Sequence, residues 1–196
     1  MSIILLLIIL VLYIIYYYYV TPEALTLKSD IDGQYYKVYH GGQETADTLA
    51  KINKQNLKFL DHLKENYSSY TSKRQADVDR LLERYNPDNI VETFNRPKKG
   101  GTTSFSLRKG VKLSLCLRGV DMIMHDFNTL MFVNVHELAH VSQNTVQHST
   151  EYWRGFKWLL EQAVKAGIYK KVDYSKYPKC YCGMKLDSSP LYMKMD

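Results

Sequence analysis

The sequence feature that most constrains this chain is a His-Glu-x-x-His motif, His136-Glu137-x-x-His140, inside the apolar run 130–141. Residues four apart lie on one face of a helix, so the two imidazoles can converge on one metal ion. Glu137 lies beside them, where its carboxylate can accept a proton from a metal-bound water. Zinc suits such a site because it binds imidazole well. The motif therefore predicts an active-site helix, and the alternative is two core histidines with a chance glutamate.

A third histidine, His148, follows His140 after seven residues. A catalytic zinc needs three protein ligands and one open position for water. The polar segment 142–147 is long enough for the chain to leave the helix, turn and bring back a third imidazole. We therefore predict that His136, His140 and His148 bind Zn²⁺ and that Glu137 is the catalytic general base.

These residues resemble the WLM and SprT-like zinc metallopeptidases, in which a second segment, His-x-x-x-aromatic-Trp, follows the motif helix. His148 and the pair Tyr152-Trp153 match that segment, with Tyr152 where the family usually has Phe. Weaker similarity, over about residues 32–191, is to a WLM-type group found in large DNA viruses. The resemblance implies an α+β, zincin-like metallopeptidase domain with a small mixed sheet, acting on protein or peptide substrates.

The N-terminal residues 3–20 carry no charged side chain, and four tyrosines occupy positions 16–19. This is about the length that a helix needs to span the hydrocarbon core, and tyrosines favour the membrane interface. A cleaved signal peptide would instead have a basic start and a small-residue cleavage site. We therefore predict a single-pass transmembrane anchor that contacts the lipid bilayer through residues 3–20, in a host or virion membrane if the chain is viral.

The orientation of this anchor is indicated only by a few residues. Lys28 and Lys37 follow the span and no basic residue precedes it, which favours a cytosolic catalytic domain. The sequence Asn66-Tyr67-Ser68 is a formal glycosylation site and favours the opposite side.

Three cysteines provide no even-numbered disulfide framework. Cys116 lies in an apolar strand-like run and is predicted to be a buried small hydrophobe. Cys180 and Cys182 form a single Cys-x-Cys, which is too little for a structural zinc site. Thiols kept reduced fit a cytosolic domain best.

The net charge is +6, with basic clusters at 72–74, 96–99 and 170–171. Such a charge can favour nucleic acid or anionic lipid. No basic stripe interleaved with aromatic residues is visible, so a solvated basic surface is the favoured interpretation and a nucleic-acid partner the less favoured one.

Hydrophobic spacing predicts helices at 44–67, 74–85 and 151–166, and a motif helix that begins near Thr129 after capping oxygens at Asp126 and Asn128. Strands are predicted at 34–39, 90–94, 103–107 and 111–117. We predict that substrate pairs with an open edge of strand 111–117, although an interior strand with both edges paired fits the sequence equally. The predicted organisation is an anchor at 1–20, a tether at 21–32 and a metallopeptidase domain at 33–196.

The function predicted from these features is peptide-bond hydrolysis by a membrane-anchored zinc metallopeptidase. The alternative is a membrane-tethered structural or virion protein with a non-catalytic zinc site. Glu137 argues against that alternative, because a purely structural site needs ligands and no base. A protease acting on nucleoprotein is a third interpretation, disfavoured by the predicted anchor.

Overall fold

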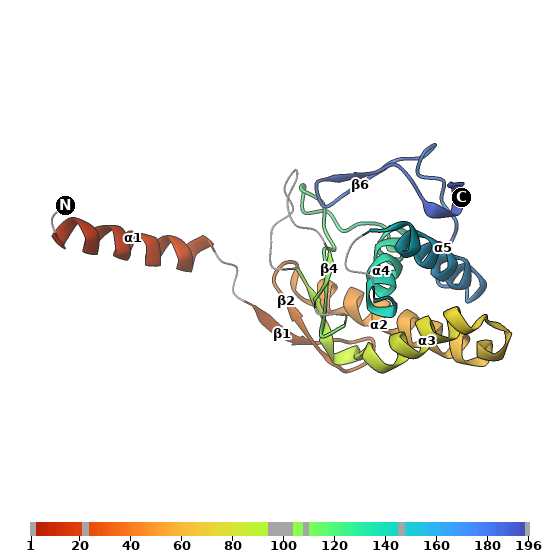
Figure 1. Cartoon of the computed structure of the whole chain (residues 1–196). Coiled ribbons are helices and arrows are strands. Elements are labelled where there is room, and N and C mark those ends of the chain that lie inside the picture. The colour runs from red at the N-terminus through yellow and green to blue at the C-terminus, as the bar shows by residue number, and fades with distance from the viewer. Residues whose placement is uncertain (1–2, 21–23, 94–103, 108–109, 145–147, 195–196) are drawn as a thin grey trace.

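The computed structural model describes residues 3–20, 24–93, 104–107, 110–144 and 148–194 of the chain (Figure 1). Its helices are α1 (Ile3–Val20), α2 (Gly42–Glu65), α3 (Ser72–Arg84), α4 (Phe127–Ser142) and α5 (Thr150–Lys165). Its strands are β1 (Leu25–Lys28), β2 (Tyr35–Val38), β3 (Ile90–Glu92), β4 (Phe105–Leu107), β5 (Lys112–Leu115), β6 (Lys179–Tyr181) and β7 (Met184–Leu186). Short 3₁₀ turns cover Tyr67–Ser69, Pro87–Asn89 and Pro190–Tyr192. The architecture is α+β, as predicted.

The five-stranded sheet is small and mixed, with the strand order β1-β2-β3-β5-β4. The central pairs β2–β3 and β3–β5 are parallel, and the outer pairs β1–β2 and β4–β5 are antiparallel. Along β2 the side chains of Tyr36 and Val38 are buried while Tyr35 and Lys37 are exposed, which is the alternation of a strand with one face on the core. Helices α2 to α5 lie together beside this sheet (Figure 1).

Two strands of the sheet, β1 and β5, bear on what was expected from the sequence. The expected tether contains strand β1, which pairs with β2 from Leu25↔Val38 to Lys28↔Tyr35. Strand β5 is interior, between β3 and β4, so of the two alternatives for strand 111–117 the one with both edges paired is confirmed. The basic cluster at 96–99 lies outside the described residues.

The apolar N-terminal segment forms α1, and Figure 1 shows this helix set apart from the other elements. Its described side chains, Leu5 to Tyr13, are 47% to 61% exposed. Within the described part of the chain, no helix is long and apolar enough to cross a membrane. This finding contradicts the predicted transmembrane anchor and the membrane localisation.

Side chains outside the motif helix α4 form hydrogen bonds with both of its ends. At its start, Asp126 accepts hydrogen bonds from the backbone N–H and the hydroxyl of Thr129, at 3.0 and 2.7 Å, as predicted. At its end, Arg80 donates to the Ser142 carbonyl at 2.7 Å, and Arg84 to the Val141 carbonyl at 3.1 Å. These guanidinium groups satisfy carbonyls that a helix leaves free and complement the negative end of its dipole.

Helices α4 and α5 approach each other closely at Gly155. A Cβ atom built on Gly155 would lie 2.2 Å from Nε2 of Gln143. The buried Gln143 side chain also donates from Nε2 to the Tyr152 carbonyl, at 3.3 Å. The absence of a side chain at Gly155 therefore sets the distance between the end of α4 and the first turns of α5.

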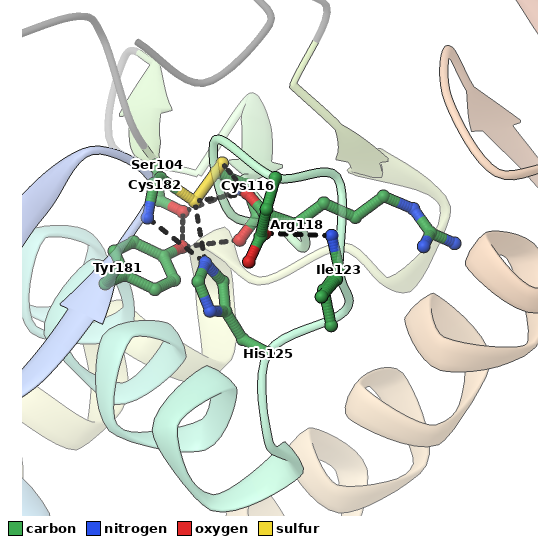
Figure 2. Close-up of a disulfide and its surroundings, with 8 residues drawn as sticks. Ser104, Cys116, Arg118, Ile123, His125, Tyr181 and Cys182 are labelled. Atoms are coloured by element: carbon green, nitrogen blue, oxygen red, sulfur yellow. Dashed lines mark hydrogen bonds between the residues drawn. A yellow bond between two sulfur atoms is a disulfide. The ribbon is translucent and has the colours of Figure 1, made fainter. Parts of the chain in front are cut away.

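A disulfide joins Cys116, just after β5, to Cys182, in the turn between β6 and β7 (Figure 2). Cys116 is buried as predicted, with 1% exposure, but the prediction that the thiols are kept reduced is wrong for these two residues. Cys180 is free and exposed. The disulfide partners are 66 residues apart, and closing a loop of that length contributes about 4 kcal/mol in the chain-entropy description.

Candidate metal centre

Helix α4 presents the two motif histidines toward the start of α5, as the four-residue spacing predicts. The rings of His136 and His140 lie 4.9 Å apart, nearly perpendicular to each other. Both side chains are half-buried, whereas Glu137 is only 4% exposed. The helix therefore places the two imidazoles at the surface of the domain and the carboxylate one position on, inside it.

His148 reaches the same point from the chain just before α5. Ser149 caps α5 by accepting a hydrogen bond from the Tyr152 N–H at 3.2 Å, so His148 is fixed by the start of a helix. The Nε2 atom of His148 lies 3.1 Å from Nε2 of His140 and 3.1 Å from Nε2 of His136. One ligand atom from each of the three histidines falls within 4.8 Å of the others. The three predicted residues are thus brought together.

This histidine cluster, His136, His140 and His148, fits a divalent cation. In a tetrahedral site with Zn–N distances of about 2.0–2.1 Å, two ligand nitrogens lie about 3.3–3.4 Å apart. The two Nε2–Nε2 distances of 3.1 Å are close to that value. Three imidazoles without a fourth protein ligand from this cluster are the donor set of a site that keeps an open position.

Burial keeps the first ligand neutral. The pKa of His136 is lowered to about 3, first by burial and then by the neighbouring His140 and His148 rings. A neutral imidazole has a free lone pair for a metal ion, because protonation would occupy it. His136 is therefore a neutral imidazole near neutral pH.

Burial also acts on the adjacent carboxyl group. It raises the pKa of Glu137 to about 8, against the smaller opposing effect of a hydrogen bond from the Ser106 backbone N–H. A cation in the histidine cluster would favour the charged carboxylate and lower this pKa. Burial therefore makes the Glu137 carboxylate a stronger proton acceptor than an exposed one.

Aromatic rings pack around the cluster from α5. The Tyr152 ring stacks on His140 with centroids 4.3 Å apart, and its hydroxyl donates to the His136 carbonyl at 3.0 Å. Trp153 lies 5.6 Å from the His148 ring, and Phe156 lies 5.1 Å from the His136 ring. Each imidazole is thus held by a different aromatic residue, so the ring orientations are fixed before any ion binds.

Strand β4 adjoins the centre, which was not apparent from the sequence. Its Ser106 N–H binds Glu137, and among the described strands β4 is the outer one on this side of the sheet. Periodicity alone could not identify the edge, because strand order depends on pairings distant in sequence. His125, the other histidine near α4, lies beside Cys182 instead, with its Nε2 accepting the Cys182 N–H at 3.1 Å.

Comparisons with known proteins give relatives from large viruses. No protein-family model matches the chain. The uncharacterized protein R325 of Acanthamoeba polyphaga mimivirus is 32% identical over 173 residues, which cover 86% of this chain and 85% of that protein. The uncharacterized protein 136R of Invertebrate iridescent virus 6 is 30% identical over 105 residues, which cover 52% of this chain and 56% of that protein.

Among solved structures, the crystal structure of Wss1 from Saccharomyces cerevisiae has a TM-score of 0.38 and 16% identity, over 64% of this chain and 75% of that chain. A likeness of this size carries no argument about fold or activity. The similarity to R325 extends over most of both sequences, which confirms the predicted kinship with viral proteins. The chain belongs to the family of the mimivirus protein R325.

Proposed function

We propose that this protein is a zinc-dependent peptidase with a zincin-like active site. The observation that carries the proposal is the convergence of the His136, His140 and His148 Nε2 atoms beside the buried carboxyl group of Glu137. A structural zinc site would need a fourth ligand and would gain nothing from a buried carboxyl group whose proton affinity is tuned by its surroundings.

In this proposal His136, His140 and His148 hold the ion as neutral imidazoles. Zinc bound there would supply the Lewis acid that activates a water and polarises the substrate carbonyl. Glu137 accepts the proton of the attacking water and passes it to the leaving amine, as a carboxylate whose proton affinity is raised by burial. Tyr152 orients two of the ligands, through its ring on His140 and its hydroxyl on the His136 carbonyl.

The proposed substrate is a protein or peptide in an extended conformation, lying along β4. A strand at the edge of a sheet offers unpaired backbone groups, with which a peptide can form an additional strand. The Ser106 N–H that binds Glu137 belongs to β4, so a peptide paired with this strand would pass close to the base. The role first predicted for strand 111–117 is therefore assigned to β4.

The test is cleavage of an unfolded protein such as casein by zinc-loaded wild type and Glu137→Gln. Gln keeps the size of the side chain but cannot take the proton, so activity should fall by about 10²–10⁴-fold. Zinc content should stay at one ion per chain. Glu83→Gln, an exposed substitution on α3, is the matched control and should cleave like wild type.

Two results would count against this function. Zinc-loaded wild type that cleaves no unfolded protein would favour a structural metal site. A Glu137→Gln variant as active as wild type would remove Glu137 as the base, whatever the metal does.

A further inference from the structure

The Cys116–Cys182 disulfide attaches the β6–β7 hairpin to the domain. Strands β6 and β7 are three residues each and pair only with each other in the described structure. An isolated two-stranded hairpin of this size is marginally stable in water. Its turn places Cys182 at φ 48°, a left-handed conformation that costs energy for a residue other than glycine. The hairpin therefore depends on its attachments to the domain.

The second attachment is Tyr181, whose hydroxyl joins the hairpin to two segments of the main sheet (Figure 2). It donates to the Cys116 carbonyl at 2.7 Å and lies 2.6 Å from the Ser104 hydroxyl oxygen. That Ser104 oxygen also accepts the Cys116 N–H at 2.9 Å. Tyr181 is only 1% exposed, so these bonds are shielded from water and form only while the hairpin is docked.

Ser104 leads directly into β4, and β4 leads to the metal centre. Two residues after Ser104, the Ser106 N–H binds the Glu137 carboxyl group. The buried Tyr181 is itself near enough to Glu137 for the carboxylate charge to contribute, after burial, to raising the pKa of the tyrosine. A continuous set of contacts therefore runs from the disulfide through Tyr181 and Ser104 to the proposed base.

Sγ of Cys182 lies beside an imidazole, at the wall of a cavity. Nε2 of His125 is 3.5 Å from Sγ of Cys182, and the His125 ring lies 4.9 Å from that of Tyr181. His125, Cys180 and Cys182 line a cavity of about 490 Å³. A small thiol can occupy a space of that size, and the marginal hairpin can open enough to admit it.

We propose that Cys116–Cys182 is a thiol–disulfide exchange site that reacts with a dithiol reductant and thereby controls β4 and the metal centre. A thiolate of the reductant attacks Sγ of Cys182, forming a mixed disulfide and releasing the Cys116 thiolate. The second reductant thiol then displaces Cys182, leaving two reduced cysteines and an oxidised cyclic reductant. The two electrons and two protons come from the dithiol, and its protons end on the two cysteine thiols.

Reduction removes the covalent tie, so the hairpin undocks and Tyr181 leaves the Ser104 and Cys116 groups. Strand β4 then loses its anchor at Ser104, and the Ser106 N–H is no longer fixed against Glu137. The effect on peptide cleavage rests on the proposed function, whereas the exchange chemistry and the release of β4 do not.

The test compares full-length protein before and after incubation with dithiothreitol. Alkylation and mass spectrometry should find one reactive cysteine before reduction, Cys180, and three after it. Hydrogen exchange in segments 104–107 and 179–186 should speed up about tenfold or more on reduction, the size expected for the loss of one or two hydrogen bonds. Exchange in the middle of α2 should not change, and zinc-loaded protein should lose cleavage activity in parallel with reduction.

Variants of the cysteines and of Tyr181 test the parts of this proposal separately. Cys116→Ser with Cys182→Ser should exchange rapidly at 104–107 with or without dithiothreitol, and Cys180→Ser should respond like wild type. Tyr181→Phe keeps the disulfide and the ring but loses the hydroxyl, so it should speed exchange at 104–107 while the hairpin stays attached.

The proposal is overturned if the reduced protein exchanges at 104–107 as slowly as the oxidised protein, or if Cys180→Ser abolishes the response. These readouts need no catalysis. If hydrogen exchange stays slow after reduction while cleavage depends on Glu137, the thiol–disulfide exchange site is rejected and the peptidase is kept. If hydrogen exchange becomes fast but the protein cleaves nothing, the peptidase is rejected and the thiol–disulfide exchange site is kept.

Discussion

The side-chain amides of Asn56 and Asn134 donate hydrogen bonds to each other across the interface of α2 and α4, at 3.2 and 2.6 Å. Both residues have 0% exposure. Asn56 also donates to the Tyr85 hydroxyl at 3.1 Å, so this amide pair extends toward α3. Because Asn134 precedes His136 by half a helical turn, the pair fixes the rotation of α4 about its own axis, and with it the direction of the histidines.

Replacing Asn134 with Leu should lower the free energy of unfolding by about 1–3 kcal/mol, because the buried Asn56 amide loses its partner. Urea unfolding measures the change. Asn56→Leu combined with Asn134→Leu removes both polar groups, so the double variant should be less destabilised than the sum of the single variants. Strict additivity would show that the two amides do not interact.

The metal-binding prediction contrasts two histidines on either side of α4. His148→Ala should weaken zinc binding by more than the roughly 10–100-fold that partners of metal ligands typically contribute, because it removes a ligand. His125→Ala should leave zinc content unchanged, since His125 lies beside Cys182. Metal analysis after dialysis, with circular dichroism to confirm folding, measures both. Unchanged zinc in His148→Ala would mean that a residue outside the cluster is the third ligand.

Stability should fall as pH rises through the titration of Glu92. Burial raises the pKa of this carboxyl group above its ordinary value of 4.5, against smaller opposing effects of the Tyr39 and His40 backbone N–H groups and of Arg118. Between the ordinary and the raised pKa the folded state binds more protons than the unfolded state, so the free energy of unfolding decreases with pH. Unfolding at a series of pH values from 4 upward measures this slope.

Glu92→Gln is the control for that slope. The Gln side chain carries no titrating proton and keeps an oxygen that can accept from the Tyr39 and His40 N–H groups, which Glu92 binds at 2.6 and 2.7 Å. The variant should therefore become more stable relative to wild type as pH rises. A difference that stays constant over the whole series would assign the slope to another group.

Gly155→Ala tests the close approach of α4 and α5. Alanine ordinarily favours a helix over glycine by about 1 kcal/mol, but here its Cβ would displace the buried Gln143 amide from the Tyr152 carbonyl. We expect a net loss of about 1–3 kcal/mol, as in other overpacked interiors, and weaker zinc binding because Tyr152 and His148 shift with α5. Adding Gln143→Ala should relieve the clash and restore part of the zinc affinity.

Local patterns in the sequence predicted most of the secondary structure. The spacing of apolar residues located α2, α3 and α5 to within two residues at each end, and Asp126 was correctly assigned as a capping residue of α4. The histidine cluster was predictable because its members lie within 13 residues on two adjacent helical segments. Helical periodicity and ligand spacing are short-range properties, so they can be read along the chain.

Features that depend on distant pairings were missed. Strand β1 was taken for a tether, because four residues carry too little periodicity to reveal a partner such as β2. The Ser106–Glu137 contact and the Cys116–Cys182 bond join residues 31 and 66 positions apart. An odd number of cysteines also gave no indication of which two would pair.

The hydrogen bonds from Arg80 and Arg84 to the last carbonyls of α4 affect how the protein can fold while it is being synthesised. Both arginines leave the ribosome about 60 residues ahead of the carbonyls that they bind, and domains begin to form while synthesis continues. Helix α3 can therefore receive α4 as soon as it emerges, with two imidazoles already aligned. His148 is synthesised last of the three, so an ion that arrives early meets only a pair of ligands and can still leave.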